Sequence, residues 1–218
     1  MTPLILLLLG TVPSCDTGAK EARVRVGLYA DFQHEPSTAV RAVIQDELAA
    51  IMVPIGPTLE WRSLAENKGD ERWTMLVVVH FKGKCDLSDL STYPPYPWIL
   101  GRTHLSDGAI IPFSDIYCSA IRAFLAPSLV SMDEQSRTFV FGRAIGRVLA
   151  HELYHVLAGT KRHGSSGLGE AFYTPRELVA DDFQFQDQEI QRVRFAIAPP
   201  LGNIATQRGD HLCRGKTQ

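Results

Sequence analysis

The spacing of apolar and polar residues predicts strands and helices along most of the chain. Alternation of the two kinds over residues 23–30 predicts a strand, and apolar residues three and four apart predict a helix over residues 38–52. Residues 59–64 are expected to form a second strand. The continuous apolar run of residues 73–81 predicts a central strand that is buried on both faces.

Turn and capping residues divide the second half of the chain. An Asp-Gly pair between residues 101–105 and 109–117 predicts a hairpin. A long helix is expected between a capping box that begins at Ser131 and a stop at Gly159. A further helix is expected to begin at Thr174, which a proline follows. This order of elements predicts an α/β (α+β) fold, in which a mixed twisted sheet packs on the long helix and a second helix.

Two glycines lie one helical turn apart in the predicted long helix, at positions 142 and 146. A GxxxG step in the helix of a soluble protein lets a neighbouring element come close, because neither residue carries a side chain. We expect Gly142 and Gly146 to permit close packing of this helix on the sheet.

Length and composition are those of an ordinary globular protein. The chain has 218 residues, which suffice for one domain, and 45% of them are hydrophobic. The formal net charge of -2 and the lack of a basic stripe give no indication of a polyanion partner, so we expect no nucleic-acid binding. Residues 22–190 are predicted to form the domain, after a linker at residues 16–21 and before an irregular tail at residues 191–218. The oligomeric state is not indicated.

The N-terminus resembles an export signal over residues 1–15. Its apolar run is too short to span a bilayer and has the length of a signal-peptide core. The segment Val-Pro-Ser-Cys that ends at Cys15 resembles a lipobox, whose cysteine is lipidated after cleavage. A plain secretory signal, or a buried strand, is the alternative. We therefore expect a periplasmic or extracellular protein, anchored to a membrane if Cys15 carries a lipid.

Cysteine usage fits this compartment. Besides Cys15, the chain has cysteines at positions 85, 118 and 213. A disulfide is expected in an oxidising compartment. Cys85 and Cys118 both lie beside predicted strands in the body of the domain, so we predict that they pair, whereas Cys213 lies in the polar tail. None of the four has the C-x-x-C spacing of a zinc site.

The sequence His-Glu-Leu-Tyr-His at residues 151–155 lies inside the predicted long helix. His151 and His155 are four residues apart, so both imidazoles lie on one face and can reach one metal ion. Glu152 lies next to the first histidine, where it can take a proton from metal-activated water. Two histidines and a glutamate are costly inside an apolar helix unless something pairs them. The motif therefore predicts a hydrolytic zinc site, with satisfied surface histidines as the alternative.

A catalytic zinc site of this kind needs a third protein ligand. His163 comes four residues after the predicted stop at Gly159, and a chain that turns there can bring it back toward the metal. Glu177 is the second candidate. It fits equally well as the partner of Thr174 in a capping box. Both candidates remain open from the residues alone.

The segment HELYHVLAGTKRH resembles the HExxHxxGxxH signature of the metzincin zinc peptidases, lengthened by two residues. The form HExxH-x7-H is similar to a group of bacterial secreted metzincin-like proteins. In that clan the glycine turns the chain, so the resemblance implies His151, His155 and His163 as zinc ligands and Glu152 as general base. Metzincins carry a methionine-containing turn beneath the zinc, but residues 167–171 here contain no methionine.

A second resemblance is to the gluzincin clan, through Glu-x-x-Ala-Asp on the following helix. It implies Glu177 as the third ligand and Asp181 as a hydrogen-bond partner of a ligand histidine. Tyr173 is expected to be a half-buried core residue, with stabilisation of an oxyanion as the alternative. The hairpin of residues 101–117 could supply an edge strand that binds the backbone of a substrate.

These observations lead to one preferred function and two alternatives. We expect a zinc-dependent metallohydrolase, a peptidase, that acts on peptides or proteins outside the cytoplasm. The alternatives are a non-catalytic exported lipoprotein that binds zinc, and an extracellular binding domain without a metal. The intact Glu152 favours the enzyme, because a structural metal site has no use for a base at that position.

Overall fold

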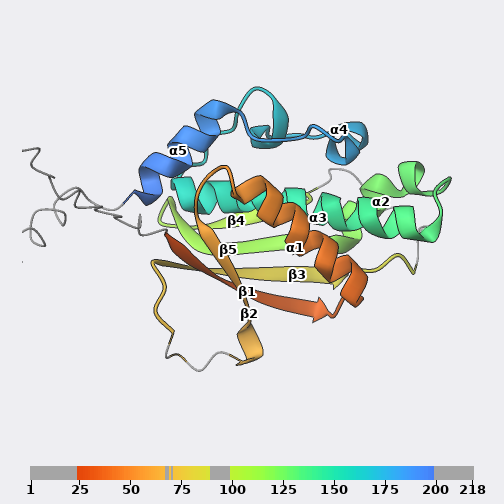
Figure 1. Ribbon diagram of the computed structural model, residues 1–218, viewed down its shortest axis with the longest axis horizontal. Helices are drawn as coiled ribbons and strands as arrows, with labels where there is room; N and C mark the ends of the chain where they lie inside the picture. The colour runs from red at the N-terminus through yellow and green to blue at the C-terminus, as the bar shows by residue number, and fades with distance from the viewer. Residues whose placement is uncertain (1–23, 67–68, 70, 89–98, 199–218) are drawn as a thin grey trace, which may run out of the picture.

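A five-stranded sheet organises the fold (Figure 1). The computed structural model describes residues 24–66, 69, 71–88 and 99–198. The strands follow the order β2-β1-β3-β5-β4 across the sheet. Their bounds are Arg25–His34 for β1, Thr58–Ser63 for β2, Met75–Lys84 for β3, Gly101–Ser106 for β4 and Ala109–Tyr117 for β5. Four strands are parallel, and β4 pairs with β5 in the antiparallel direction at one edge.

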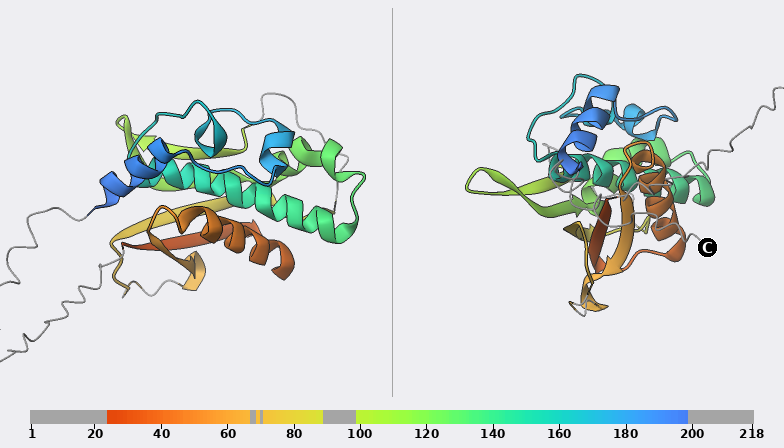
Figure 2. Two further views of the ribbon diagram at one scale, coloured as in Figure 1. Left: turned by 45° about the horizontal axis from the view of Figure 1, so that its top comes forward. Right: turned by 60° about the vertical axis from the view of Figure 1, so that its left-hand side comes forward.

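Helices cover one face of this sheet. Their bounds are Thr38–Met52 for α1, Cys118–Leu129 for α2, Glu134–Ala158 for α3, Pro175–Val179 for α4 and Asp187–Ile197 for α5. Figures 1 and 2 show α1 and α3 side by side across the sheet, with α4 and α5 beyond α3. The expected α/β fold with a mixed sheet is therefore confirmed, as a single domain.

The strand β3 differs from the prediction in its burial. It is the central strand, as expected, but only one of its faces is buried. Val77, Val79 and Phe81 are fully buried, whereas Leu76 is 39% exposed on the opposite face. The reason is that α1 and α3 lie together on one side of the sheet, so a continuous apolar run does not here mean cover on both sides.

Three helix boundaries also differ from the prediction. The cap of α3 is Asp133 rather than Ser131, because the Asp133 carboxylate accepts a hydrogen bond from the Ser136 amide at 3.0 Å. The helix at Thr174 begins with the predicted capping box but is only five residues long, so α1 is the second helix that packs beside α3. The helix α5 continues to Ile197, past residue 191, where the irregular tail was expected. The buried Val193 explains this, because it adds an apolar contact to the core.

The two glycines of α3 contact a helix and not the sheet, which corrects the expected partner. A Cβ atom on Gly142 would lie 2.7 Å from Cβ of Val43, and one on Gly146 would lie 3.0 Å from Cβ of Glu47. Both of these neighbours belong to α1. Larger residues would therefore push α1 away from α3.

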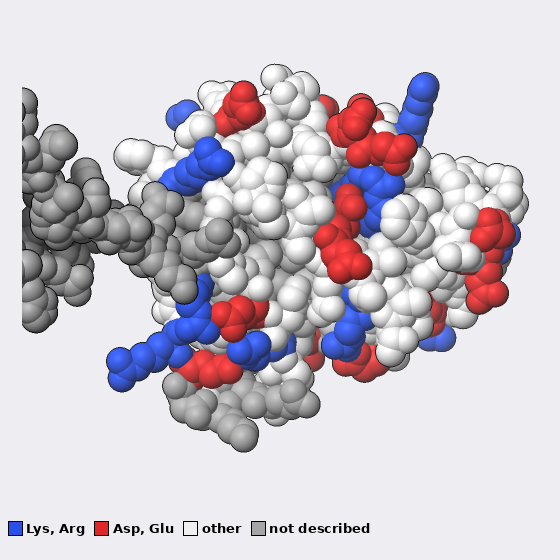
Figure 3. Space-filling model, in the orientation of Figure 1, with Lys and Arg blue, Asp and Glu red and all other residues white. Residues whose placement is uncertain are grey.

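A buried ionic network joins α1, α3 and α4. Arg147 is fully buried on α3, and its guanidinium donates to the Glu47 carboxylate at 2.6 Å and to the Leu178 carbonyl at 2.8 Å. Arg143 binds the second oxygen of the same carboxylate at 3.2 Å. Elsewhere on the face in Figure 3, acidic and basic side chains lie next to one another rather than in separate patches. The network fixes α3 one turn before its first motif histidine.

Replacing Glu47 by alanine should lower the free energy of unfolding by about 3–5 kcal/mol, because Arg147 would remain buried without its counter-charge. Equilibrium urea unfolding measures this loss. The matched control is Glu35→Ala, which breaks an exposed pair with Arg41 and should cost less than about 1 kcal/mol. Equal losses in the two variants would contradict a structural role for the network.

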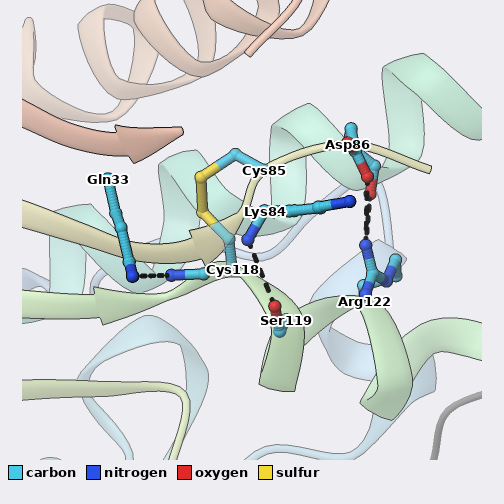
Figure 4. The surroundings of a disulfide bond; sticks show 8 residues. Gln33, Lys84, Cys85, Asp86, Cys118, Ser119 and Arg122 are labelled. Atoms are coloured by element: carbon cyan, nitrogen blue, oxygen red, sulfur yellow. Dashed lines mark hydrogen bonds and ion pairs between the residues drawn. A yellow bond between two sulfur atoms is a disulfide. The ribbon is translucent and has the colours of Figure 1, made fainter. Parts of the chain in front are cut away.

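The predicted disulfide between Cys85 and Cys118 is confirmed, with 4.9 Å between the Cα atoms. It ties the chain after β3 to the first residue of α2 (Figure 4). Two contacts flank it: the Lys84 amide donates to the Ser119 hydroxyl at 3.3 Å, and the Arg122 guanidinium binds the Asp86 carboxylate at 3.1 Å. A disulfide is consistent with an extracellular location.

The predicted export signal, the lipid site at Cys15 and the tail with Cys213 lie outside the described residues. They stay predictions. Within the described ranges, no helix combines the length and the apolar character needed to cross a bilayer. The longest of them, α3, carries charged residues along its length and packs on the sheet.

Replacing both cysteines of the disulfide by alanine should lower the free energy of unfolding by about 3–4 kcal/mol. The 33-residue separation of Cys85 and Cys118 gives a loop whose closure restricts the unfolded chain by roughly that amount. Urea unfolding of the oxidised protein and of the double variant measures the difference. A reductant should destabilise the natural chain and leave the variant unchanged; the same effect on both would exclude the disulfide as its cause.

Candidate metal centre

The second half of α3 carries the histidine motif into the interior. His151, Glu152 and His155 are only 7%, 5% and 7% exposed. Apolar neighbours on the helix bury them, because Val148, Leu149, Ala150 and Leu153 all pack in the core. Three ionisable side chains within one turn and a half of a buried helix are unfavourable unless each finds a partner. The contacts of each one therefore indicate what the site holds.

The third histidine returns to this helix through a left-handed turn. Gly159 ends α3 with a φ of 56°, which reverses the chain direction as predicted. His163 then stacks on His151, with ring centroids 5.3 Å apart, and lies edge-on to His155 at 4.8 Å. One ring nitrogen from each of the three histidines lies within 4.8 Å of the others. We call these three residues the His triad.

Backbone carbonyls fix the orientation of two of the rings. Nδ1 of His151 lies 2.8 Å from the Leu168 carbonyl oxygen, and Nδ1 of His155 lies 2.7 Å from that of Thr160. A carbonyl only accepts hydrogen bonds, so both protons lie on Nδ1 and both Nε2 atoms are bare. These two Nε2 atoms face each other at 3.0 Å. Two lone pairs that close together repel each other unless a cation lies between them.

The surroundings of the three rings also favour their uncharged form, which is the form that a metal needs. Burial lowers the pKa of His151 to about 3, with the neighbouring His155 adding to the shift. Burial likewise lowers the pKa values of His155 and His163. Nitrogens that share one tetrahedral zinc ion stand roughly 3.3–3.4 Å apart. The bare Nε2 atoms of His151 and His155, at 3.0 Å, lie close to this spacing, and the His triad could hold a divalent metal ion.

Glu152 lies beside the His triad without an opposite charge. Its Oε2 accepts a hydrogen bond from the Thr103 hydroxyl at 2.7 Å, and burial raises its pKa to about 7 despite that bond. No ion pair to Glu152 exists in the described part of the chain. A buried carboxylate with one hydroxyl partner is short of stabilisation, and a nearby metal cation would supply it and lower the pKa.

Tyr173 contacts the back of the site. Its hydroxyl donates to the Leu168 carbonyl at 2.6 Å and lies 2.6 Å from Nδ1 of His151. This nitrogen is on the opposite side of the ring from the bare Nε2. Tyr173 therefore holds the ring of His151 in place and leaves its Nε2 free to face a metal. It is partly buried against the core, as expected, and it also lines the cavity beside the His triad.

The rival ligand Glu177 is used elsewhere. Its carboxylate accepts hydrogen bonds from the amide and the hydroxyl of Thr174, both at 2.7 Å, and completes the capping box of α4. It does not belong to the group whose ligand atoms lie together. Asp181 binds Arg143 at 3.1 Å and is almost fully exposed, so it does not orient a ligand histidine. The gluzincin-like arrangement is therefore wrong for this chain.

A cavity of about 580 Å³ opens onto the His triad and Glu152. Its walls are mostly apolar, and its polar lining residues include the His triad, Glu152, Thr103 and Tyr173. The apolar lining residues include Ile99, Leu100, Leu105, Ile110, Phe124, Val148 and Phe172. One side of the cavity is β4, the edge strand of the sheet, which contributes Gly101, Arg102 and Thr103. The predicted edge strand near the metal site is therefore present.

A scan against protein-family models and a search of the curated proteins found no match to this chain. The motif and the geometry of the His triad alone therefore connect it with zinc enzymes.

Several residues of the site gave no signal in the sequence. Thr103 lies 49 residues before Glu152, and the carbonyls of Thr160 and Leu168 act through the backbone, which any residue could supply.

The ligand set can be tested by zinc content. Replacing His163 by alanine should weaken zinc binding by at least about a hundredfold, because a ligand is lost and a neutral donor set of three becomes two. Replacing Glu177 by glutamine should leave zinc binding unchanged and only weaken α4. Competition with a coloured chelator measures both. Loss of zinc from the Glu177 variant with retention in the His163 variant would reverse the assignment.

Proposed function

We propose that this protein is a zinc-dependent metallohydrolase that cleaves peptide bonds. The observation that carries the proposal is the position of Glu152, a buried carboxylate that lines the same open cavity as the three histidines of the His triad. A site that only stabilises the fold is closed and surrounded by its ligands, whereas a catalytic site keeps access for a substrate. The cavity beside the His triad supplies that access.

The chemistry divides between the metal and the chain. A zinc ion held by His151, His155 and His163 would supply Lewis-acid chemistry, by lowering the pKa of water and polarising a substrate carbonyl. Glu152 accepts the proton that the attacking water loses. Its Oε2 accepts one hydrogen bond from Thr103, and the remaining lone pairs of the carboxylate can take this proton. The protonated Glu152 then donates the proton to the leaving nitrogen, which completes the hydrolysis.

The cavity is suited to an extended peptide. The strand β4 forms one wall and is the last strand of the sheet, so one edge of its backbone has no partner strand among the described residues. A substrate in an extended conformation can pair with such an edge through main-chain hydrogen bonds. The apolar walls would then bind its apolar side chains. Export, if the N-terminal signal acts as predicted, would place this activity in the periplasm or outside the cell.

The resemblance to metzincins supports the proposal in part. The two extra residues before His163 still allow its ring to reach His151 and His155. In place of the methionine-containing turn, the chain has the short 3-10 helix Gly167–Gly169. Its central Leu168 is fully buried, and its carbonyl orients His151. We infer that this turn supports the metal site without a methionine.

Replacing Glu152 by glutamine should abolish hydrolysis and leave zinc bound, because the amide keeps the shape but cannot accept the proton. The expected fall in kcat is at least about 10²–10⁴-fold, the usual contribution of a general base. Cleavage of a peptide library by the zinc-loaded protein provides the measurement.

The matched control is Glu134→Gln, which removes an exposed carboxylate at the first turn of the same helix and should leave kcat unchanged. Equal activity of the Glu152 variant and the natural chain would exclude Glu152 as the base. Stoichiometric zinc without cleavage of any peptide would instead support the non-catalytic metal-binding alternative.

A further inference from the structure

The carboxylate of Glu152 lies against the backbone of β4, although Glu152 belongs to α3. The closest approach is at Gly101. A Cβ atom added to this glycine would lie 2.5 Å from Oε1 and 2.8 Å from Cγ of Glu152, and also 2.8 Å from Cγ1 of Val148. Real Cβ atoms do not make such short contacts. Any larger residue at position 101 would therefore occupy the space that the carboxylate now fills.

Thr103, two residues further along β4, donates a hydrogen bond to the Glu152 carboxylate. Its hydroxyl lies 2.7 Å from Oε2 of Glu152, 3.1 Å from the Glu152 carbonyl oxygen and 3.1 Å from the Ser114 hydroxyl. The Glu152 carbonyl only accepts, and so does the carboxylate in the ionised form that acts as a base, so Thr103 donates its single proton in their direction. Ser114, which is fully buried on β5, must then donate to Thr103. The chain of hydroxyls has one direction, from Ser114 through Thr103 to Glu152.

Gly101 and Thr103 are on the same side of β4, because side chains two residues apart in a strand point to the same face. We propose that these two residues are positioning residues for Glu152, and that they hold its carboxylate in one place beside the His triad. We call the pair the carboxylate seat. The inference rests on the proposed function in that it gives the held carboxylate a catalytic purpose.

The helix α3 alone does not fix the position of the Glu152 carboxylate, and the carboxylate seat does. The helix fixes the Cα and Cβ atoms of Glu152, but three side-chain torsions still separate its carboxylate from the backbone. A general base must lie within hydrogen-bond reach of the proton that it takes. Gly101 supplies the space and Thr103 the direction, so the torsions are restricted before a substrate arrives. A misplacement of about 1 Å can cost on the order of a hundredfold in rate.

If Thr103 had only a structural role, its packing would matter and its hydrogen bond to Glu152 would not. The strand β4 is already paired with β5 through its backbone, with Thr103 opposite Ser114. A valine would fill the same space as Thr103 and would satisfy packing between β4 and α3. A serine would keep the hydroxyl and lose only a methyl group. The two substitutions therefore separate the hydrogen bond from the packing at one position.

The experiment compares Thr103→Val and Thr103→Ser in the full chain loaded with zinc. The matched control is Thr58→Val, the same change on the exposed opposite edge strand β2. The first readout is the position of the Glu152 carboxylate in crystal structures of the variants. It should leave its place or split between conformers in Thr103→Val, and it should stay in Thr103→Ser and Thr58→Val. An unmoved, singly ordered carboxylate in Thr103→Val would overturn the role of Thr103.

Gly101→Ala tests the other half of the carboxylate seat. Its methyl group should displace the carboxylate in the crystal structure, while zinc content stays at one ion per chain. A Glu152 side chain in its original place would overturn the role of Gly101. Because both structural readouts are independent of turnover, they decide the inference even if the natural chain cleaves no peptide, a result that would refute only the proposed function.

Where the natural chain does cleave peptides, kcat adds a second readout. It should fall about tenfold or more in Thr103→Val, with KM and zinc content unchanged, because substrate and metal contacts remain while the base is displaced. Thr103→Ser should restore kcat to within about threefold of the natural value. A fall of the same size in both variants would assign the effect to packing and overturn the inference.

Discussion

Two histidine nitrogens that face each other without a proton between them are the constraint on which this structure depends. Nε2 of His151 and Nε2 of His155 lie 3.0 Å apart, and both rings use their only proton on a backbone carbonyl. Two neutral acceptors in this position have no hydrogen bond to offer each other. Burial lowers the pKa of both rings, which disfavours a second proton on either one. A divalent cation between the two nitrogens would resolve the conflict.

The remaining scaffold serves to maintain this arrangement. The buried pair of Arg147 and Glu47 fixes α3 against α1 one turn before His151, and two glycines allow the helices to approach closely. At the other end of α3, the left-handed Gly159 returns the chain so that His163 completes the His triad. The edge strand β4 reaches the same point from the sheet and holds the carboxylate of Glu152. Helix, loop and sheet thus meet at one site.

Part of this arrangement can be predicted from the sequence. The helix α1 has the bounds that its apolar spacing predicted. The Asp-Gly pair of the hairpin adopts the two positive φ angles that such a turn requires. The ligand spacing of His151 and His155 follows from one helical turn. The contact of Thr103 with Glu152 does not follow, because it joins residues 49 positions apart through the pairing of the sheet. Nor could the apolar run of β3 show that the described helices cover only one of its faces.

The choice between His163 and Glu177 shows the same limit. Both residues stand at plausible spacings, and only the three-dimensional path of the chain separates them. The carboxylate of Glu177 satisfies the first turn of α4, whereas His163 stacks on His151. The sequence showed that Glu177 could cap a helix and that it could bind a metal. It did not show that the cap is the role that Glu177 takes.

The most direct test is a crystal structure of the zinc-loaded protein with anomalous diffraction data measured at the zinc edge. The account predicts one anomalous peak per chain, bonded to nitrogens of His151, His155 and His163, with Glu152 beside it on the cavity side. A protein that takes up no stoichiometric zinc, or a peak located away from these three rings, would contradict it.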